Sequence, residues 1–516
     1  MKRKICFLMA VMMVVGIVGC SEKKPAEPEK DNVSSSEELD VQEGTPVYED
    51  DIQIEIGSYA GPRVLKYRYY NGAYGEHPGD PEGGWEGWLT EEAFRDYLDC
   101  GFTYVMPEYD GLYDTKTDGA KREAAYEFEE SDLYAYMELA EKVGLPVVVG
   151  AEQLTAMTSM TDYRMAEDTK VFFKDMIERL SEYKMFKGVT FRDEPNIEWA
   201  NSYGAAYDYF KELDSDLYYF TSYLPMYSGD QTRLSKDNTL DLEDAYREYV
   251  RTFADATDGF YYDAYPLIID PATGKTRLEK TWYQNLRIVA EEVKAKGVDA
   301  GLTIQAGSFG PENAENSVEH RRTVNTKADV TFQLYTSLAY GMKDIAYFTY
   351  WEHWMEGNAE AHYSAMVMYP EKAGGEPIKT DAYYAVKAAN EEIKKFDHVF
   401  LRYDWEGTMA LTKEGVEMSD ALKYAGDYQS PRIASVTATD EAIIGCMKDE
   451  DGYDGYMIVN ATDPGQNLSN TVTVTFKQAS KAMIYVEGEE KIVDLKDGSY
   501  TFELKSGEGV FAIPLV

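Results

Sequence analysis

The sequence predicts a (β/α)8 barrel followed by a C-terminal antiparallel β-sandwich. Its 516 residues exceed one ordinary hydrophobic core, so at least two domains are expected. Apolar runs of strand length first alternate with helical patterns. From about residue 432 the helical pattern gives way to short alternating runs separated by glycine turns. We therefore expect the barrel at 56–400 and a linker with the sandwich at 401–516.

Eight apolar or aromatic runs are the predicted barrel strands: 64–70, 103–106, 146–150, 188–192, 217–222, 259–263, 300–305 and 345–350. Helical patterns lie between them, for example at 91–100, 203–213, 242–255 and 282–296. This alternation predicts parallel strands joined by crossover helices, and eight repeats fit a barrel. The alternative is an open doubly wound sheet, which commonly carries a G-x-G-x-x-G turn after its first strand. Residues 69–75, Tyr-Tyr-Asn-Gly-Ala-Tyr-Gly, lack that spacing.

The C-terminal part contains six short alternating runs: 442–447, 456–460, 471–476, 482–486, 499–504 and 509–515. Turn pairs such as Asp454-Gly455 and Asp497-Gly498 separate them, which is typical of an antiparallel sandwich. Cys446 in this region and Cys100 in the barrel are expected to be buried and unreactive.

The N-terminus predicts export and lipid attachment. A basic start precedes 15 apolar residues at 5–19, too few to span a membrane and typical of a signal peptide. Ile17-Val18-Gly19-Cys20 resembles a bacterial lipobox, which implies cleavage after residue 19 and lipid attachment to Cys20. The alternative is a plain secretory signal with an incidental cysteine. Residues 20–55 are predicted to be a disordered acidic tether, since 21–51 hold 11 acidic and 3 basic residues.

The whole chain is acidic, with 93 Asp and Glu against 51 Lys and Arg and a formal net charge of −42. Such a surface repels phosphate backbones, so nucleic acid is not expected as a partner. We expect a body that lies outside the cytoplasm, anchored by lipid to the bacterial cell membrane or outer membrane. The sequence does not indicate an oligomeric state.

The end of the fourth predicted strand carries two adjacent carboxylates, Asp193 and Glu194, followed by Pro195. Active sites of barrels gather where strands end at their carboxyl side. The Asp-Glu-Pro stretch resembles the Asn-Glu-Pro signature of clan-A glycoside hydrolases, with Asp193 where Asn is usual. It is similar to family-42 β-galactosidase-type barrels, as are the stretches 261–266 and 339–351. The two carboxylates could instead be a solvated loop pair or a helix cap.

The resemblance implies that Glu194 is the general acid/base. Glycoside hydrolysis also needs a second carboxylate. The resemblance places this group at the end of strand seven, where the chain has Gln305, and an amide cannot attack. Carboxylates at neighbouring strand ends are the substitutes, in the order Glu352, Asp263 and Glu152, although each could be a structural group.

Aromatic and polar side chains at strand ends are the candidate sugar-binding residues. Flat rings can stack on sugar faces, and the resemblance favours Trp351 as the floor of the central subsite. Ordinary packing is the alternative, above all for the tyrosines. The candidate substrate-binding residues are Asp193, Trp351, Trp354, Tyr265, Gln305, Tyr109 and Glu152; Tyr223, Trp85 and Trp88 are further candidates.

The sequence contains no motif typical of metal or cofactor chemistry. Its five histidines show no H-E-x-x-H spacing, and it has no G-x-S-x-G stretch. No cofactor and no metal are therefore expected. The sequence predicts a glycoside hydrolase-like surface lipoprotein that cleaves an extracellular oligo- or polysaccharide by carboxylate acid/base chemistry. The alternative is a non-catalytic carbohydrate-binding lipoprotein that lost the strand-seven nucleophile.

Overall fold

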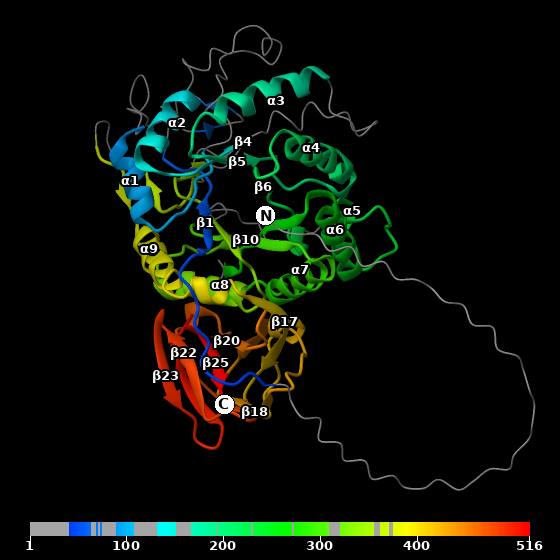
Figure 1. Ribbon diagram of the computed structural model, residues 1–516, viewed down its shortest axis with the longest axis vertical. Coiled ribbons are helices and arrows are strands. Elements are labelled where there is room, and N and C mark those ends of the chain that lie inside the picture. Colours follow the sequence, from blue (N-terminus) through cyan, green and yellow to red (C-terminus); the bar gives the residue numbers. More distant parts are fainter. Residues whose placement is uncertain are drawn as a thin grey trace, which may run out of the picture. The chain divides into compact units, whose positions relative to one another are not determined.

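The computed structural model describes residues 41–62, 69–70, 73–74, 89–107, 132–150, 167–191, 193–228, 231–270, 273–308, 320–354, 362–370 and 375–516. Val41–Val516 form one compact unit (Figure 1). The predicted signal peptide, Cys20 and the first half of the tether lie outside the described residues. Within the described part of the chain, no helix is long and apolar enough to cross a membrane.

Two parallel sheets form the first part of this unit. One has the order β1-β12-β10-β7, with strands Glu55–Ser58, Asp344–Phe348, Asp299–Gln305 and Gly259–Asp263. The other has the order β4-β5-β6, with strands Val147–Gly150, Phe186–Thr190 and Tyr218–Phe220. Helices between the strands include α4 (Ala200–Leu213), α6 (Leu242–Thr257), α7 (Trp282–Lys296) and α8 (Lys327–Leu338), and α9 (Asp381–Ile393) follows β12. The fold is therefore mixed α/β with parallel strands and crossover helices.

The prediction of the first strand at 64–70 was wrong. The strand that pairs with β12 is β1, in which Ile56 is completely buried, as is Ile54 just before the strand. Tyr69–Tyr70 instead forms β2, which pairs with β3 (Ala73–Tyr74) as a short antiparallel hairpin. The aromatic run around residue 69 suits a strand locally, but the apolar residues of β1 supply the contact with the helices.

Single bridges and backbone hydrogen bonds connect the edges of the two parallel sheets. Thr103 N donates to Ile56 O at 2.7 Å, and Val105 forms a parallel bridge with Val147, so 103–106 runs between β1 and β4. On the other side, Tyr223 follows β6 and forms a parallel bridge with Tyr262 of β7.

A second set of side chains packs on the face of these strands that is turned away from the helices. One cluster of buried residues contains Tyr59, Tyr104, Met106, Val148, Phe220 and Ala346, with Tyr218, Tyr261 and Phe348 packed against it. Its members come from strands of both sheets and from 103–106. Gly57 makes room for this cluster, since a Cβ there would lie 2.2 Å from the ring of Tyr104.

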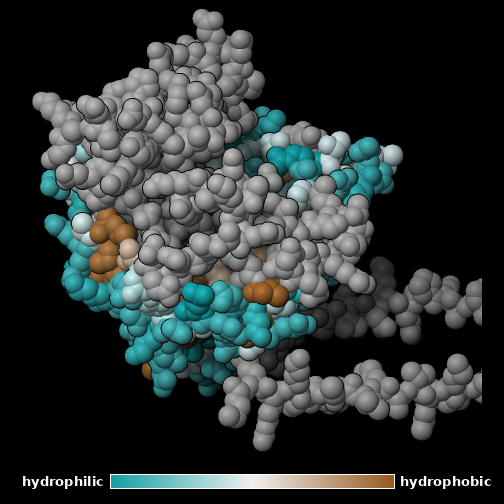
Figure 2. Space-filling model, turned by 90° about the horizontal axis from the view of Figure 1, so that it is seen from above, coloured by the Kyte–Doolittle hydropathy of each residue, from teal (hydrophilic) through white to brown (hydrophobic). Residues whose placement is uncertain are grey.

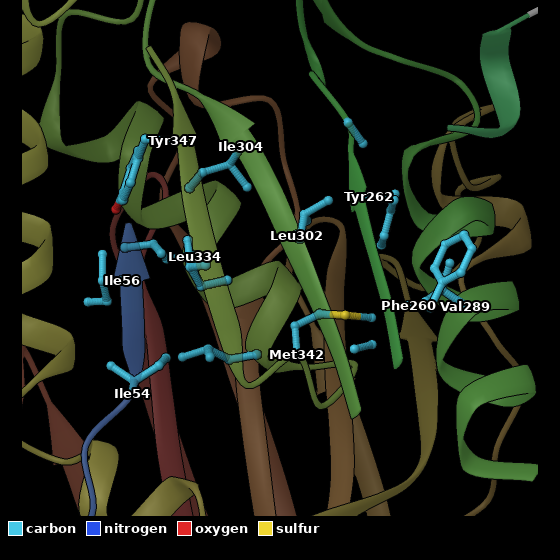
Figure 3. Packing of buried hydrophobic residues seen from close by; sticks show 14 of the residues in the cluster. Ile54, Ile56, Phe260, Tyr262, Val289, Leu302, Ile304, Leu334, Met342 and Tyr347 are labelled. Carbon is cyan, nitrogen blue, oxygen red and sulfur yellow. The ribbon is translucent and has the colours of Figure 1, made fainter. Parts of the chain in front are cut away.

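The opposite face of the strands packs against the helices. Figure 3 shows Ile56 of β1 and Leu302 and Ile304 of β10 in this layer, together with Ile54 just before β1, Leu334 of α8 and Val289 of α7. Alternate residues along β12 serve different cores, because Ile345 and Tyr347 lie in this layer while Ala346 and Phe348 lie in or against the other cluster, as the two-residue period of a strand requires. Helix α8 begins with a capping box formed by Thr326 and Asp329.

The C-terminal part consists of two antiparallel sheets. The larger has the order β17-β19-β20-β25-β22-β23, with strands Tyr403–Leu411, Ala442–Asp449, Asp454–Asn460, Gly509–Leu515, Lys481–Val486 and Glu489–Asp494. The smaller has the order β18-β21-β24, with strands Ile433–Ala438, Asn470–Phe476 and Ser499–Leu504. A shared cluster includes Ile444 and Ile458 of the larger sheet and Val474 and Phe502 of the smaller. Cys446 and Cys100 are both buried free thiols, as expected.

Residues 43–54 lie against the C-terminal sheet, although the sequence predicted a disordered tether up to residue 55. The Tyr48 hydroxyl lies 2.6 Å from that of Tyr403 and donates to Asp449 at 2.9 Å. Arg402 pairs with Asp51, and Ile54 N donates to Asp397 at 3.0 Å. Composition hides this attachment because a few side chains supply it among many acidic residues.

The C-terminal sheets also pack against the helices of the first part. The Tyr283 hydroxyl of α7 donates to Ala461 O at 2.9 Å, and Figure 1 shows α7 and α8 between the parallel strands and the C-terminal strands. The face of the molecule in Figure 2 is mostly hydrophilic where it is coloured, with small separate hydrophobic areas. This agrees with the acidic composition.

Candidate active site

The carboxyl ends of four parallel strands lie side by side at the candidate site. Glu194 N, after β5, donates to Ser222 O at 2.8 Å, and Asp263 N, at the end of β7, donates to Tyr223 O at 3.3 Å. Ala264 N donates to Thr303 O of β10 at 3.0 Å. These bonds bring Glu194 and Asp263 to one edge, with the segment after β6 between them.

Glu194 lines a cavity of about 420 Å³. Its backbone has a φ of 46°, in the left-handed region that residues other than glycine rarely adopt. The side chain is 41% exposed, and its Oε2 lies 3.7 Å from Nη2 of Arg233. The residues that line the cavity are Asp193, Glu194, Pro195, Asn196, Trp199, Tyr203 and Arg233.

Asp263 lies deeper than Glu194, with 6% of the residue exposed. Burial raises the pKa of the Asp263 carboxyl well above its usual range, and the negative charges of Glu194 and Asp193 raise it further. Burial also raises the pKa of Glu194, while the positive charge of Arg233 acts against this rise. The arrangement therefore combines one carboxyl group that retains its proton strongly with a second that ionises more readily.

Gln305 is completely buried, and both ends of its amide are used by the backbone. Its Nε2 donates to Gly307 O at 3.0 Å and to Arg322 O at 2.7 Å, and its Oε1 accepts from Leu267 N at 3.2 Å. A carboxylate could not donate either of the first two bonds. The structure thus places Gln305 in a structural role that needs an amide.

Glu352 and Trp351 are also buried, at 3% and 2% exposure. Glu352 Oε2 accepts a hydrogen bond from Tyr369 N at 2.9 Å, and the Trp351 ring packs on Tyr369 with centroids 5.3 Å apart. The predicted sugar platform and the first substitute nucleophile therefore both take part in packing this loop.

The remaining predicted residues divide into three groups. Tyr265 lies beside Asp263, and a hydrogen bond from it lowers the pKa of that carboxyl. Tyr223 is buried and its hydroxyl lies 2.6 Å from that of Thr257, so it belongs to the core. The backbone of Trp354 pairs with His362, while its side chain lies outside the described residues, as do Tyr109, Glu152, Trp85 and Trp88.

Comparisons with known proteins find similarity only in structure. No family model matches the chain, and no curated protein matches its sequence. Its solved structural neighbours are glycoside hydrolases. An Anoxybacillus α-amylase has 11% identity and a TM-score of 0.48, covering 90% of this chain and 98% of that one. A glycoside hydrolase family 5 protein from Bacteroides vulgatus has 12% identity and a TM-score of 0.48, covering 90% and 89%.

Three residues of the cavity were not predicted from the sequence: Trp199, Tyr203 and Arg233. Trp199 follows Glu194 by five residues, at the end of the short helix η4 (Ile197–Trp199), and is partly buried. Its proximity to the Asp-Glu-Pro stretch could have drawn attention to it. Arg233 is 39 residues from Glu194 in sequence, so only the tertiary structure brings it to the site.

Among the described residues, no group of three or more His, Cys, Asp or Glu side chains is arranged to hold a metal ion. Asp193, Glu194 and Asp263 interact electrostatically, and Arg233 supplies the positive charge beside Glu194. Two neighbouring carboxyl groups in different environments can supply one proton and accept another, which is the requirement of acid/base hydrolysis.

Proposed function

We propose that this protein is a glycoside hydrolase that uses Glu194 and Asp263 as its two working carboxyl groups. The observation that carries the proposal is their placement at the ends of β5 and β7, on either side of the segment after β6, in unequal environments. Asp263 is almost completely buried, whereas Glu194 opens to a cavity and is paired with Arg233. Unequal environments push the pKa values of two carboxyl groups apart, which suits one as acid and the other as base.

Asp263 is the better candidate than Glu352 for the second carboxyl group. The main chain after β5 and the end of β7 both bond to the segment after β6, which supports Asp263 as the neighbour of Glu194. Glu352 instead accepts a backbone hydrogen bond from Tyr369 and is buried in its loop. Under this proposal, the strand-seven position of the clan-A resemblance does not supply a reacting group, because Gln305 has a structural role.

The proposal includes closure of the eight strands into a (β/α)8 barrel. The bridges from Val105 to Val147 and from Tyr223 to Tyr262 support it, since they connect the two parallel sheets at both edges. The separate inner cluster of residues from both sheets supports it as well, because a barrel interior is filled by side chains. The likeness to family-42 β-galactosidase-type barrels remains part of this proposal and rests on the Asp-Glu-Pro stretch.

The proposed substrate is an extracellular oligo- or polysaccharide. The cavity beside Glu194 has about 420 Å³, within the range of small-ligand sites, and Trp199 contributes an aromatic ring to its wall. We propose Trp199 as a stacking surface for a sugar ring, because Trp351 is packed on Tyr369. A buried tryptophan cannot present a face to substrate.

The proposed location is the outer surface of a bacterial membrane, with lipid attached to Cys20. The signal-like N-terminus and the lipobox-like stretch support it. Expression of the full chain with Cys20→Ser should release the protein from the membrane fraction, as detergent-phase partitioning would show. Equal membrane association of parent and variant would contradict lipid attachment at Cys20.

A non-catalytic carbohydrate-binding protein is the second candidate function. Gln305 at the position where the clan-A resemblance expects a nucleophile favours it. A screen of residues 41–516 against oligosaccharides, scoring both binding and release of reducing sugar, separates the two. We expect hydrolysis of at least one bound glycan. Binding without hydrolysis of any bound glycan would contradict the enzyme and support the binding protein.

A further inference from the structure

Arg233 reaches Glu194 from a separate element of the fold. It lies in the short helix α5 (Gln231–Leu234), in the connection between β6 and α6. Its Nη2 donates to the main-chain oxygen of Glu194 at 2.8 Å, and its Nε donates to Asn196 Oδ1 at 2.7 Å. The same Nη2 lies 3.7 Å from Glu194 Oε2. One guanidinium therefore contacts the backbone, the side chain and the following loop of a proposed working residue.

These contacts hold Glu194 in an unusual backbone conformation. With a φ of 46°, the residue needs external support to remain in the left-handed region. Its N–H donates to Ser222 O, and its C=O accepts from Arg233, so both sides of the residue are fixed. Tyr249 of α6 fixes the next residue, because its hydroxyl donates to Pro195 O at 2.6 Å.

The same guanidinium makes the electrostatic environments of the two carboxyl groups differ. Charged and titratable groups near Glu194 are Asp193 on its own loop, Arg233 on α5, Asp263 on β7 and Tyr249 on α6. Arginine retains its charge at any pH of interest, and it lowers the pKa of Glu194 against the effect of burial. Burial and two negative neighbours instead raise the pKa of Asp263.

We propose that Arg233 is a positioning residue that holds Glu194 in place as the ionised member of the pair, so that Glu194 acts as the base and Asp263 as the acid. This rests on the proposed hydrolase function. Asp263 would give its proton to the leaving glycosidic oxygen while the bond to the anomeric carbon breaks. Water would attack that carbon and give its proton to Glu194. Transfer of that proton to solvent and reprotonation of Asp263 restore the site, so the net reaction consumes one water.

The assignment reverses the role that the clan-A resemblance implies for Glu194. The reversal has a measurable consequence in the pH dependence of kcat/KM. If Glu194 is the base, its ionisation sets the acidic limb, and loss of the Arg233 charge moves this limb to higher pH. If Glu194 were the acid, loss of that charge would instead move the alkaline limb.

The experiment compares Arg233→Met and Arg233→Lys with the parent in residues 41–516. Carboxyl ¹³C resonances of protein labelled at glutamate are titrated by NMR, with Glu194→Gln assigning the signal. In Arg233→Met, the midpoint of Glu194 should rise by about one pH unit or more, because a cation nearby lowers a carboxyl pKa by that amount. Lys236→Met is the matched control, since Lys236 is exposed in the same connection, and it should leave the midpoint unchanged.

Kinetics on a hydrolysed glycan provide the second readout. Arg233→Met should shift the acidic limb upward and lower kcat by on the order of 10- to 100-fold through misplacement of Glu194. Arg233→Lys keeps the charge but cannot form the same fork, so its titration midpoint should stay near that of the parent while kcat still falls.

An unchanged Glu194 midpoint in Arg233→Met would overturn the proposal, as would a shift of the alkaline limb alone. If Arg233→Met does not fold, Arg233→Lys decides, and parent-like kcat in that variant would count against positioning. The NMR titration needs no turnover. A parent without hydrolytic activity would therefore refute the proposed function, while the effect of Arg233 on Glu194 would still be measured.

Discussion

At the residue scale, the decisive feature of the site is the contrast between Glu194 and Asp263. Burial raises the pKa of both carboxyl groups. The positive charge of Arg233 opposes this rise at Glu194, whereas two negative charges raise the pKa of Asp263 further. A difference of this kind lets one carboxyl group donate a proton at a pH where the other accepts one. Neither group would need a metal ion for this chemistry.

The prediction for Gln305 follows from its three backbone contacts. Gln305→Glu should lower the free energy of unfolding by about 3 kcal/mol, because the new carboxylate cannot donate to Gly307 O and Arg322 O and would be buried against them. It should not create or increase hydrolytic activity. Urea unfolding and a glycan assay measure the two effects.

Gln466→Glu is the control for this substitution, because Gln466 is exposed in the C-terminal part. It should leave stability within the error of the measurement. A stable Gln305→Glu variant with increased turnover would show that residue 305 is a vacated nucleophile position after all.

The site was only partly predictable at this scale. Glu194 and Asp263 could be found because both end recognisable strands, and Glu194 belongs to a short motif. The role of Gln305 depends on Leu267 and Arg322, which lie 38 and 17 residues away, and no local pattern reports such contacts. Trp351 was predicted as a sugar platform from its position after a strand. That position says nothing about whether its ring is buried, so the prediction failed.

At the element scale, the amino ends of the parallel strands carry a buried polar group of their own. Asp344 begins β12, is 6% exposed and accepts hydrogen bonds from the hydroxyls of Tyr104 and Tyr218. Beside it, Lys187 of β5 pairs with Glu55 of β1 at 2.7 Å. These residues lie at the amino ends of the strands, next to Tyr104 and Tyr218 of the second cluster. Asp263 lies at the carboxyl end of its strand.

The pH dependence of stability should report on Asp344. Burial, the largest cause, raises its pKa from 3.8 to about 7. Between these values the folded state holds a proton that the unfolded chain has lost, so the free energy of unfolding should fall as pH rises from about 4 to about 7. The contribution is on the order of 4 kcal/mol for a shift of this size. Urea unfolding across this range measures it.

Asp344→Asn should remove this part of the pH dependence, because the amide does not titrate. Asp299→Asn is the matched control, since Asp299 begins the neighbouring strand β10 and is exposed. If parent and Asp344→Asn lose stability in parallel over this pH range, Asp344 is not responsible for the loss.

The order of helices and strands was well predicted, and the failures have local causes. The strand 259–263 has the predicted bounds, since it combines apolar residues with a glycine start. The edge strand β23 was missed because its residues are largely exposed and show no apolar alternation. The first strand was misplaced because the 64–70 stretch has more aromatic residues than Glu55–Ser58, which is short and partly charged.

At the scale of the whole molecule, residues 43–54 connect the N-terminal end of the described chain to the C-terminal sheet before entering β1. Tyr48 contacts Tyr403 and Asp449, and Arg402 donates to Glu49 O at 3.0 Å. This segment and the C-terminal part therefore stabilise each other. A protein fragment for study should begin at or before Val41, so that these contacts are kept.

Tyr48→Phe should lower the free energy of unfolding by about 1 kcal/mol, because it removes a hydroxyl that bonds to Tyr403 and Asp449 while keeping the ring. Val47→Ala is the control, since Val47 is 92% exposed. Denaturant unfolding of both variants measures the difference. Equal stability of Tyr48→Phe and Val47→Ala would mean that the segment adds nothing to the stability of the whole.

The central claim is that Glu194 and Asp263 carry out hydrolysis together, and variant kinetics on a hydrolysed glycan test it most directly. Glu194→Gln and Asp263→Asn should each lower kcat/KM by roughly 10²–10⁴-fold, the usual contribution of a general acid or base. Asp263→Asn should recover part of its rate on aryl glycosides with good leaving groups, while Glu194→Gln should not. Glu198→Gln is the control, because Glu198 is exposed in the short helix η4 just after Glu194, and it should behave like the parent. Parent-like rates in both Glu194→Gln and Asp263→Asn would contradict the account.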